Sequence, residues 1–184
     1  LGQGDTVWMA SLNQYVTGNT SHAIEIAGGS VSEMGFSIAS GGSVSVIGTL
    51  NTTVNAYNST GLTLGSGTYL MLLRYTKGSG TGSSDPKDSQ IDLWINPDDA
   101  SSESALGTAD WTLDSNDGEV KWGRDTDSLT SISMAQPSQD GRIDEIRMGT
   151  EFSEMNLTAI PEPSTLALVG LGLFGAFFRR PRRK

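Results

Sequence analysis

Apolar and polar residues alternate with a period of two through most of the first 150 residues of the chain. The pattern is clearest in five segments that glycine pairs or small polar clusters separate, namely residues 6–12, 22–27, 34–39, 43–49 and 52–57. Such alternation is typical of half-buried β-strands, because successive side chains of a strand point to opposite faces. Residues 68–75 form a more continuous apolar run, which predicts a central strand buried on both faces. Many short strands joined by polar turns predict an all-β fold, an antiparallel sandwich or barrel.

Composition excludes several classes of function. The 184 residues include no cysteine and a single histidine, His22. Disulfide scaffolds, Cys/His zinc sites, thiol chemistry and most histidine-based catalysis are therefore ruled out. The formal net charge of −9 argues against a protein that binds nucleic acid by neutralising phosphates. We expect no nucleic-acid partner.

The basic residues gather at the C-terminus. Five of the 12 lysines and arginines lie within the last six residues, as Arg179, Arg180, Arg182, Arg183 and Lys184. Residues 1–160 hold seven bases and 20 acids, a net charge of −13. So strong an asymmetry indicates that the end of the chain is separate from the fold.

Directly before this basic tail, residues 164–178 carry no charge (STLALVGLGLFGAFF). As a helix this run would reach about 22 Å, which allows insertion into a hydrocarbon core of about 30 Å with local thinning or snorkelling arginines. Arginine-rich ends remain cytoplasmic, so the body of the protein would lie across the membrane. We therefore predict a C-terminal hydrophobic helix and an exported body.

Pro161, Glu162 and Pro163 precede the apolar run and set it off as a separate unit. A Pro-Glu-Pro motif, an apolar stretch and an arginine cluster, in that order over residues 159–184, resemble the PEP-CTERM sorting signal. The resemblance implies recognition by an exosortase, a membrane-embedded cysteine transpeptidase that cuts near the motif. It also implies transient contact with the inner membrane of a Gram-negative-type bacterium, before delivery to the cell surface, outer envelope or extracellular matrix.

The body has a resemblance of its own. Residues 6–9 (TVWM), 93–97 (LWINP) and 141–150 (GRIDEIRMGT) resemble the laminin-G-like branch of the concanavalin A-like lectin/glucanase superfamily. The implied fold is a two-sheet jelly-roll sandwich over residues 1–156, followed by a linker and sorting signal over residues 157–184. Because the chain opens on Leu1 within a strand-like pattern, we expect it to be a fragment whose N-terminal strands and secretory signal peptide lie upstream.

The superfamily includes glucanases, which act through paired carboxylates. One branch carries Glu-x-Asp-x-x-Glu on its catalytic strand, and Asp144 and Glu145 are the nearest acidic pair here. Adjacent strand residues point to opposite faces, and alignment through Asp144 puts Arg142 and Arg147 where the motif has glutamates. We therefore predict structural roles for this pair and no catalytic residues.

Two binding roles remain as hypotheses. Loop carboxylates and amides suit calcium, which laminin-G-like domains often bind, and the candidate ligands are Asp114, Asn116, Asp117, Asp125 and Asp127. Acidic turns that keep an exported domain soluble are the alternative interpretation, and no other cofactor is indicated. Trp94 alternates away from Ile91, Leu93 and Ile95, so it is predicted to be exposed or to face a second layer, as a possible ligand contact.

The combined interpretation is an exported, non-catalytic module that binds carbohydrate or another surface component. One alternative is a glycan-active enzyme whose catalytic residues lie in the missing N-terminal part. Another is a structural protein of a biofilm or surface layer that has no ligand.

Overall fold

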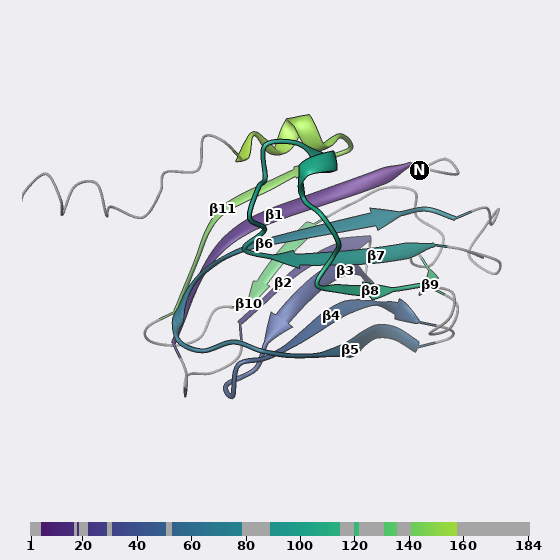
Figure 1. The fold of residues 1–184 in the computed structure, drawn as a ribbon. Helices are drawn as coiled ribbons and strands as arrows, with labels where there is room; N and C mark the ends of the chain where they lie inside the picture. The colour runs from purple at the N-terminus through teal and green to yellow at the C-terminus, as the bar shows by residue number, and fades with distance from the viewer. Residues whose placement is uncertain are drawn as a thin grey trace, which may run out of the picture.

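Two antiparallel β-sheets make up the described part of the chain in the computed structural model (Figure 1). The structure describes residues 5–16, 18, 22–28, 31–50, 53–78, 89–114, 120–121, 131–135 and 141–157. The prediction of an all-β, two-sheet antiparallel fold is confirmed. The predicted helix over residues 164–178 lies outside the described residues.

Sheet A has five strands in the order β11-β1-β6-β7-β8. Their bounds are β1 Thr6–Tyr15, β6 Gly67–Thr76, β7 Gln90–Ile95, β8 Trp111–Leu113 and β11 Arg142–Gly149. Strand β6 lies between β1 and β7, as its continuous apolar run predicted.

Sheet B has six strands, five of them in the order β10-β2-β3-β4-β5. These are β2 His22–Gly28, β3 Val31–Ile38, β4 Ser43–Leu50, β5 Thr53–Thr63 and β10 Ser131–Ala135. The sixth, β9 Val120–Lys121, pairs with β4 at Thr49 and Leu50.

The main core fills the space between the two sheets. Every second residue of a strand points inward, as Val7 and Met9 do on β1 and Ile91 and Leu93 do on β7. Sheet B contributes Ile24, Ile26, Met34, Phe36, Ile38, Val44 and Val46. The period-two pattern thus produces a sandwich whose inner faces interdigitate.

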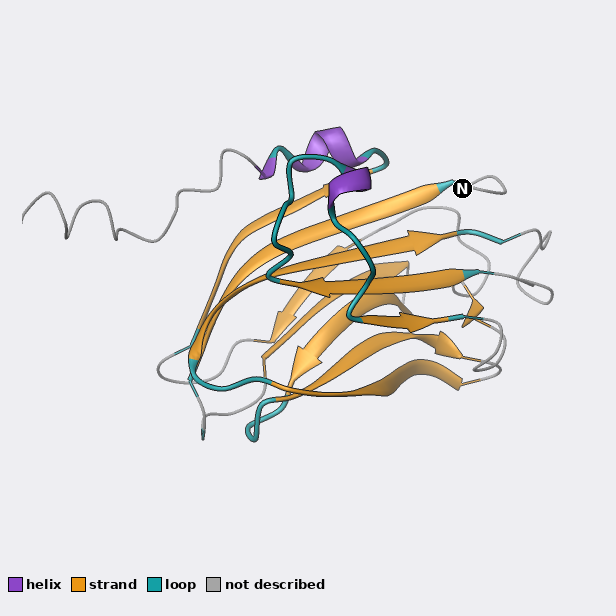
Figure 2. Cartoon of the chain, in the orientation of Figure 1, coloured by secondary structure: helices purple, strands orange, loops and turns teal. Residues whose placement is uncertain are grey.

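A second, smaller apolar cluster lies on the opposite face of sheet A. Strand residues Trp8, Ala10, Leu72 and Trp94 meet Leu106, Met155 and Leu157 from two loops. These loops carry the short 3-10 helices η1 (Glu103–Ala105) and η2 (Phe152–Met155), which cover sheet A on the side away from sheet B (Figure 2). The described body reaches Leu157, one residue beyond the predicted domain boundary.

Helix η2 packs closely against the end of β11. A Cβ atom added at Gly149 would collide with Glu154 and crowd Met155, so only glycine permits this approach. Glu154 Oε2 accepts hydrogen bonds from the backbone N–H groups of Thr150 (2.6 Å) and Glu151 (3.0 Å), and this capping box fixes the start of η2. Arg147 donates to the backbone oxygens of Met155 and Asn156 at its end.

Candidate functional site

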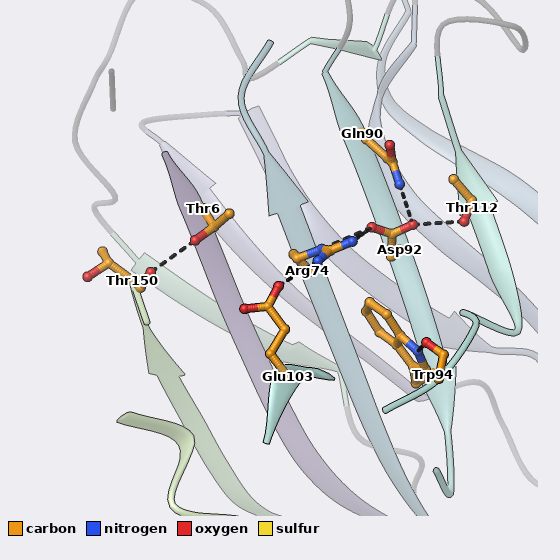
Figure 3. A network of polar contacts seen from close by, with 9 residues as sticks. Thr6, Arg74, Gln90, Asp92, Trp94, Glu103, Thr112 and Thr150 are labelled. Carbon is orange, nitrogen blue, oxygen red and sulfur yellow. Dashed lines mark hydrogen bonds and ion pairs between the residues drawn. The ribbon is translucent and has the colours of Figure 1, made fainter. Parts of the chain in front are cut away.

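Arg74 on β6 is the centre of a polar network on the covered face of sheet A (Figure 3). Its Nε and Nη2 atoms donate to Asp92 Oδ2 at 3.1 and 2.7 Å, and its Nη1 donates to Glu103 Oε1 at 2.7 Å. The guanidinium carbon also lies 5.5 Å from the Trp8 ring centroid and 5.3 Å from that of Trp94. Arg74 therefore joins strands β6 and β7 to helix η1.

Asp92 is almost fully buried, with a side chain 3% exposed, and its other oxygen is also bonded. Oδ1 accepts hydrogen bonds from Gln90 Nε2 at 2.7 Å and Thr112 Oγ1 at 2.8 Å. Burial alone would lower the pKa of Arg74, but its hydrogen bonds and charge interactions with Asp92 and Glu103 outweigh burial and raise it. The arginine is thus a permanent cation, and the network works as a structural clamp.

An open depression of about 770 Å³ lies above this clamp. It is lined by Arg74, Ser102, Glu103, Ser104, Gly107 and Thr108. Arg74 and Glu103, the two charged residues of this lining, form an ion pair with each other, which holds the η1 loop against sheet A.

Trp94 lies beneath this loop. As the alternation predicted, it points away from Ile91, Leu93 and Ile95. Of the two predicted alternatives, the exposed ring is wrong, because Trp94 is only 5% exposed, and the ring instead faces the layer formed by the η1 and η2 loops. Its ring stacks on Trp8 with centroids 5.8 Å apart, and its Nε1 donates to the backbone oxygen of Gly107 at 3.3 Å. The physical reason is the cover that helices η1 and η2 provide, which leaves this ring no open face for a ligand.

Asp144 and Glu145 lie at an irregularity in β11. The pairing of β11 with β1 changes register between Ala10 and Leu12 of β1. At this point Glu145 takes a left-handed φ of 51°. Asp144 Oδ1 accepts the backbone N–H of Glu145 at 2.8 Å, while Glu145 Oε2 pairs with Arg147 Nη2 at 3.0 Å. Both carboxylates thus have local structural partners, although the simple two-face alternation assumed from sequence does not hold at this bulge.

Of the five candidate calcium ligands, the structure describes only Asp114, which follows β8 and is half-buried. Asn116, Asp117, Asp125 and Asp127 lie outside the described residues. Within the described ranges, no three His, Asp or Glu residues gather closely enough to hold a metal ion. The calcium site stays a prediction.

Sequence reasoning missed a row of residues on the outer face of sheet B. Direct pairing between strands puts Glu25 opposite Gly35, Gly35 opposite Ile47, and Ile47 opposite Tyr57. The Tyr57 hydroxyl donates to Glu25 Oε1 at 3.2 Å, across the two intervening strands. Burial, followed by the charge of Glu25 and this hydrogen bond, raises the pKa of Tyr57. The signal in the sequence is faint, because a lone tyrosine in a β-strand usually belongs to a core.

The neighbouring row on this face has only small side chains. Ala23 pairs with Ser37, Ser37 with Ser45, and Ser45 with Ser59. The Tyr57 side chain is 60% exposed, whereas Ile47 beside it is fully buried even though it belongs to neither apolar cluster. Among the side chains that the structure describes, the outer face of sheet B thus combines one exposed aromatic ring with hydroxyl groups and a carboxylate.

A profile of the PEP-CTERM protein-sorting motif family matches residues 159–183. The match spans Pro161, Glu162 and Pro163 together with the arginines at 179, 180, 182 and 183, and Lys184 follows it by one residue. The motif indicates export through a membrane-transit sorting signal, and it implies an extracellular or surface protein that an exosortase sorts. A comparison with curated proteins found no match. Among the residues that the structure describes, no helix has the length and apolar character needed to cross a bilayer.

Proposed function

We propose that the chain is a non-catalytic binding module of the laminin-G-like, concanavalin A-like type, carried to the cell surface or extracellular matrix by its exosortase-sorted tail. Its ligand would be a carbohydrate or another surface component. The observation that carries the proposal is the sorting motif at residues 159–183 directly after a two-sheet β-sandwich. A sorting tail needs a payload that remains folded outside the cell, and a sandwich without cysteine meets that need through its core alone.

Strand positions support the laminin-G-like assignment. The three segments that carry the resemblance fall on β1, on β7 with the turn after it, and on β11, which all belong to sheet A. Strand β1 pairs with β11 near the C-terminal end of the body, so the two ends of the described fold lie in one sheet. This arrangement is compatible with a jelly roll.

The use of the carboxylates supports a binding role over catalysis. Asp92 accepts hydrogen bonds on both oxygens from neighbouring side chains, and Asp144 and Glu145 have the partners described above. Glycosidases need two carboxylates facing one bond, separated by about 5 Å or by 6.5–9.5 Å according to mechanism. These three groups are instead committed to the fold.

The tail supports transient contact with the membrane. Its apolar run would insert as a helix while the arginines remain cytoplasmic, leaving the body on the far side until the exosortase cuts. Exosortase is therefore the proposed processing partner, and a polysaccharide of the envelope or matrix is the proposed ligand.

Processing is tested by expressing the full chain in a bacterium with and without its exosortase. We expect cleavage near residues 161–163 and release of the body from the inner membrane only when the enzyme is present. A chain with Pro161→Ala, Glu162→Ala and Pro163→Ala should remain membrane-bound, whereas Ser101→Ala in an exposed loop of the body should be processed normally. Equal processing of both chains would contradict the sorting role of the motif.

Binding is tested on a glycan array together with an assay for reducing sugars. Retention on glycans without release of reducing ends would support the module. Turnover of a glycan would favour the glycan-active enzyme, and neither retention nor turnover would favour a structural surface component.

A further inference from the structure

Tyr57 lies nearly parallel to the outer face of sheet B. Adjacent strands are about 4.8 Å apart, so β5 and β2 are separated by about 14 Å across β4 and β3. The hydrogen bond between Tyr57 Oη and Glu25 Oε1 can span this distance only if both side chains extend along the sheet toward each other. The tyrosine side chain therefore passes over Ile47, and the glutamate side chain passes over Gly35.

Gly35 leaves the middle of this row bare. A Cβ atom at this position would collide with the backbone oxygen of Ile24, so the close approach of β2 and β3 requires glycine. The absence of a side chain opens the path along which Tyr57 and Glu25 meet. The full burial of Ile47 and the 60% exposure of Tyr57 fit a ring with one face toward the sheet and the other toward solvent.

The side chains around the Tyr57 ring are small and mostly polar. Ser37, Ser45 and Ser59 form the adjacent row with Ala23, and Ser133 lies beyond Glu25 in the same row as Tyr57. No side chain of these two rows is larger than serine apart from Glu25, Ile47 and Tyr57 themselves. An extended ligand could therefore lie along these two rows without meeting a bulky residue.

The side chains on the outer face of sheet B favour a sugar over a protein as the ligand. The other exposed large apolar residues of the described chain, Ile132 and Met134, pair with the inward-facing Ile26 and Ile24, so they belong to the opposite face of the sheet. The described rows of this face, with one exposed aromatic ring among hydroxyl groups, lack the apolar centre typical of protein interfaces. They do suit a sugar, whose C–H face stacks on a π-system while its hydroxyl groups bond to carboxylates and serines.

The negative charge of the chain favours neutral over acidic glycans as ligands. Glu25 lies at the edge of the platform, and the whole chain has a formal net charge of −9. An acidic polysaccharide would be repelled by the negative field of the chain.

We propose that the row Glu25–Gly35–Ile47–Tyr57 is a subsite for neutral glycans, with Tyr57 as the stacking platform and Glu25 as an acceptor for a ligand hydroxyl. This inference rests on the proposed binding function, because it names the place and the ligand class of that function. Tyr57 and Glu25 would contact the ligand directly, while Gly35 and Ile47 keep the ring flat.

Affinity electrophoresis of the full chain tests the subsite. The probes are soluble neutral polysaccharides, namely β-1,4-glucan, β-1,3-glucan, xylan and mannan, with alginate as the acidic comparison. We expect at least one neutral probe to retard the wild-type chain and alginate not to. Tyr57→Ala should weaken binding about tenfold or more, because it removes the stacking surface. Tyr57→Phe keeps the ring and should bind within about threefold of wild type.

The matched control is Met134→Ala, which removes an exposed apolar side chain from the opposite face of the same sheet. It should leave retardation unchanged, and thermal unfolding should show that every variant is folded. If Tyr57→Ala binds as well as wild type, the subsite is wrong while the binding function stands. An equal loss in Tyr57→Phe and Tyr57→Ala would overturn the stacking role, and retardation by alginate alone would overturn the neutral class. Failure of all probes to retard the wild-type chain would overturn the subsite, whereas the binding function is overturned only if the glycan array also shows no retention.

Discussion

The outer faces of the two sheets differ in what their sequences place there. On sheet A the outward positions include Trp8, Leu72 and Trp94, and two loops fold over them to form a second apolar cluster. On sheet B the outward positions include Gly35, Ser37 and Ser45, which need no cover. The same period-two pattern thus yields either a third layer or an open face, depending on the size and polarity of the outward residues.

Each face also uses its charged residues differently. Arg74 on sheet A is held by two carboxylates and two aromatic rings, and it anchors the η1 loop. Glu25 on sheet B accepts a hydrogen bond from an exposed tyrosine. We therefore expect substitutions on sheet A to act on stability and those on sheet B to act on binding.

The largest effect is expected from Trp8→Ala. Trp8 is buried beneath η2, where it stacks with Trp94 and meets Phe152 edge-on at 5.0 Å. Removing it should lower the free energy of unfolding by about 3–5 kcal/mol, measured by urea denaturation of the full chain. Tyr57→Ala on sheet B is the matched aromatic control and should cost less than about 1 kcal/mol. Similar losses in the two variants would contradict the contrast between a covered and an open face.

A smaller loss is expected from Arg74→Met. This change leaves the buried Asp92 without its cation, but the Arg74 side chain is 25% exposed, so water relieves part of the cost. We expect the free energy of unfolding to fall by about 2–3 kcal/mol. Arg74→Lys keeps the charge but lacks the planar guanidinium that donates to both Asp92 and Glu103. It should lower the free energy of unfolding by about half as much as Arg74→Met.

The control for Arg74 is Arg142→Met, which removes an exposed arginine from β11 of the same sheet. It should change the free energy of unfolding by less than about 0.5 kcal/mol. If Arg74→Met changed the free energy of unfolding as little as Arg142→Met, the interpretation of the Arg74 network as a structural clamp would be wrong.

Sequence periodicity correctly predicted which way a strand residue points. It did not predict contacts between residues that are far apart in the sequence. The outward direction of Trp94 follows from alternation with Leu93 and Ile95, but its burial depends on a loop that docks through Arg74 and Glu103, 29 residues apart. Likewise, Tyr57 and Glu25 are 32 residues apart and meet only because the registers of three strand pairs align them. Register is a property of whole sheets, which a single strand pattern does not determine.

The bulge at Glu145 escaped prediction for a related reason. A period-two pattern assumes one residue per step, whereas the positive φ of Glu145 inserts an extra step opposite β1. Nothing in the residue type marks this position, because glutamate is unusual in the left-handed region.

A pH-dependent effect is expected from Glu154→Gln in helix η2. Hydrogen bonds from the backbone N–H groups of Glu151 and Thr150 lower the pKa of Glu154. Its stabilising effect is present above the unfolded pKa, about 4.3, and is lost as the pH falls through the lower folded pKa. The variant should melt at a lower temperature than wild type at pH 7, and the two should converge in acid. Asp98→Asn, an exposed loop substitution, is the control and should melt like wild type at pH 7. A gap that grows in acid would contradict the capping role.

The smallest effect is expected in the titration of Tyr57 on sheet B. Its pKa is raised above 10 by burial first and by Glu25 second, so its protonated form contributes stability that is lost as the pH rises through the folded pKa. The phenolate absorbance of the four tyrosines can be followed against pH, and the difference from Tyr57→Phe isolates this residue. Glu25→Gln should lower the Tyr57 pKa part of the way toward its ordinary value, because the contribution of burial remains. A Tyr57 pKa that Glu25→Gln leaves unchanged would show that the two side chains do not meet in solution. A stacked neutral glycan should raise the pKa further by displacing water from the ring, which would link this open face directly to ligand binding.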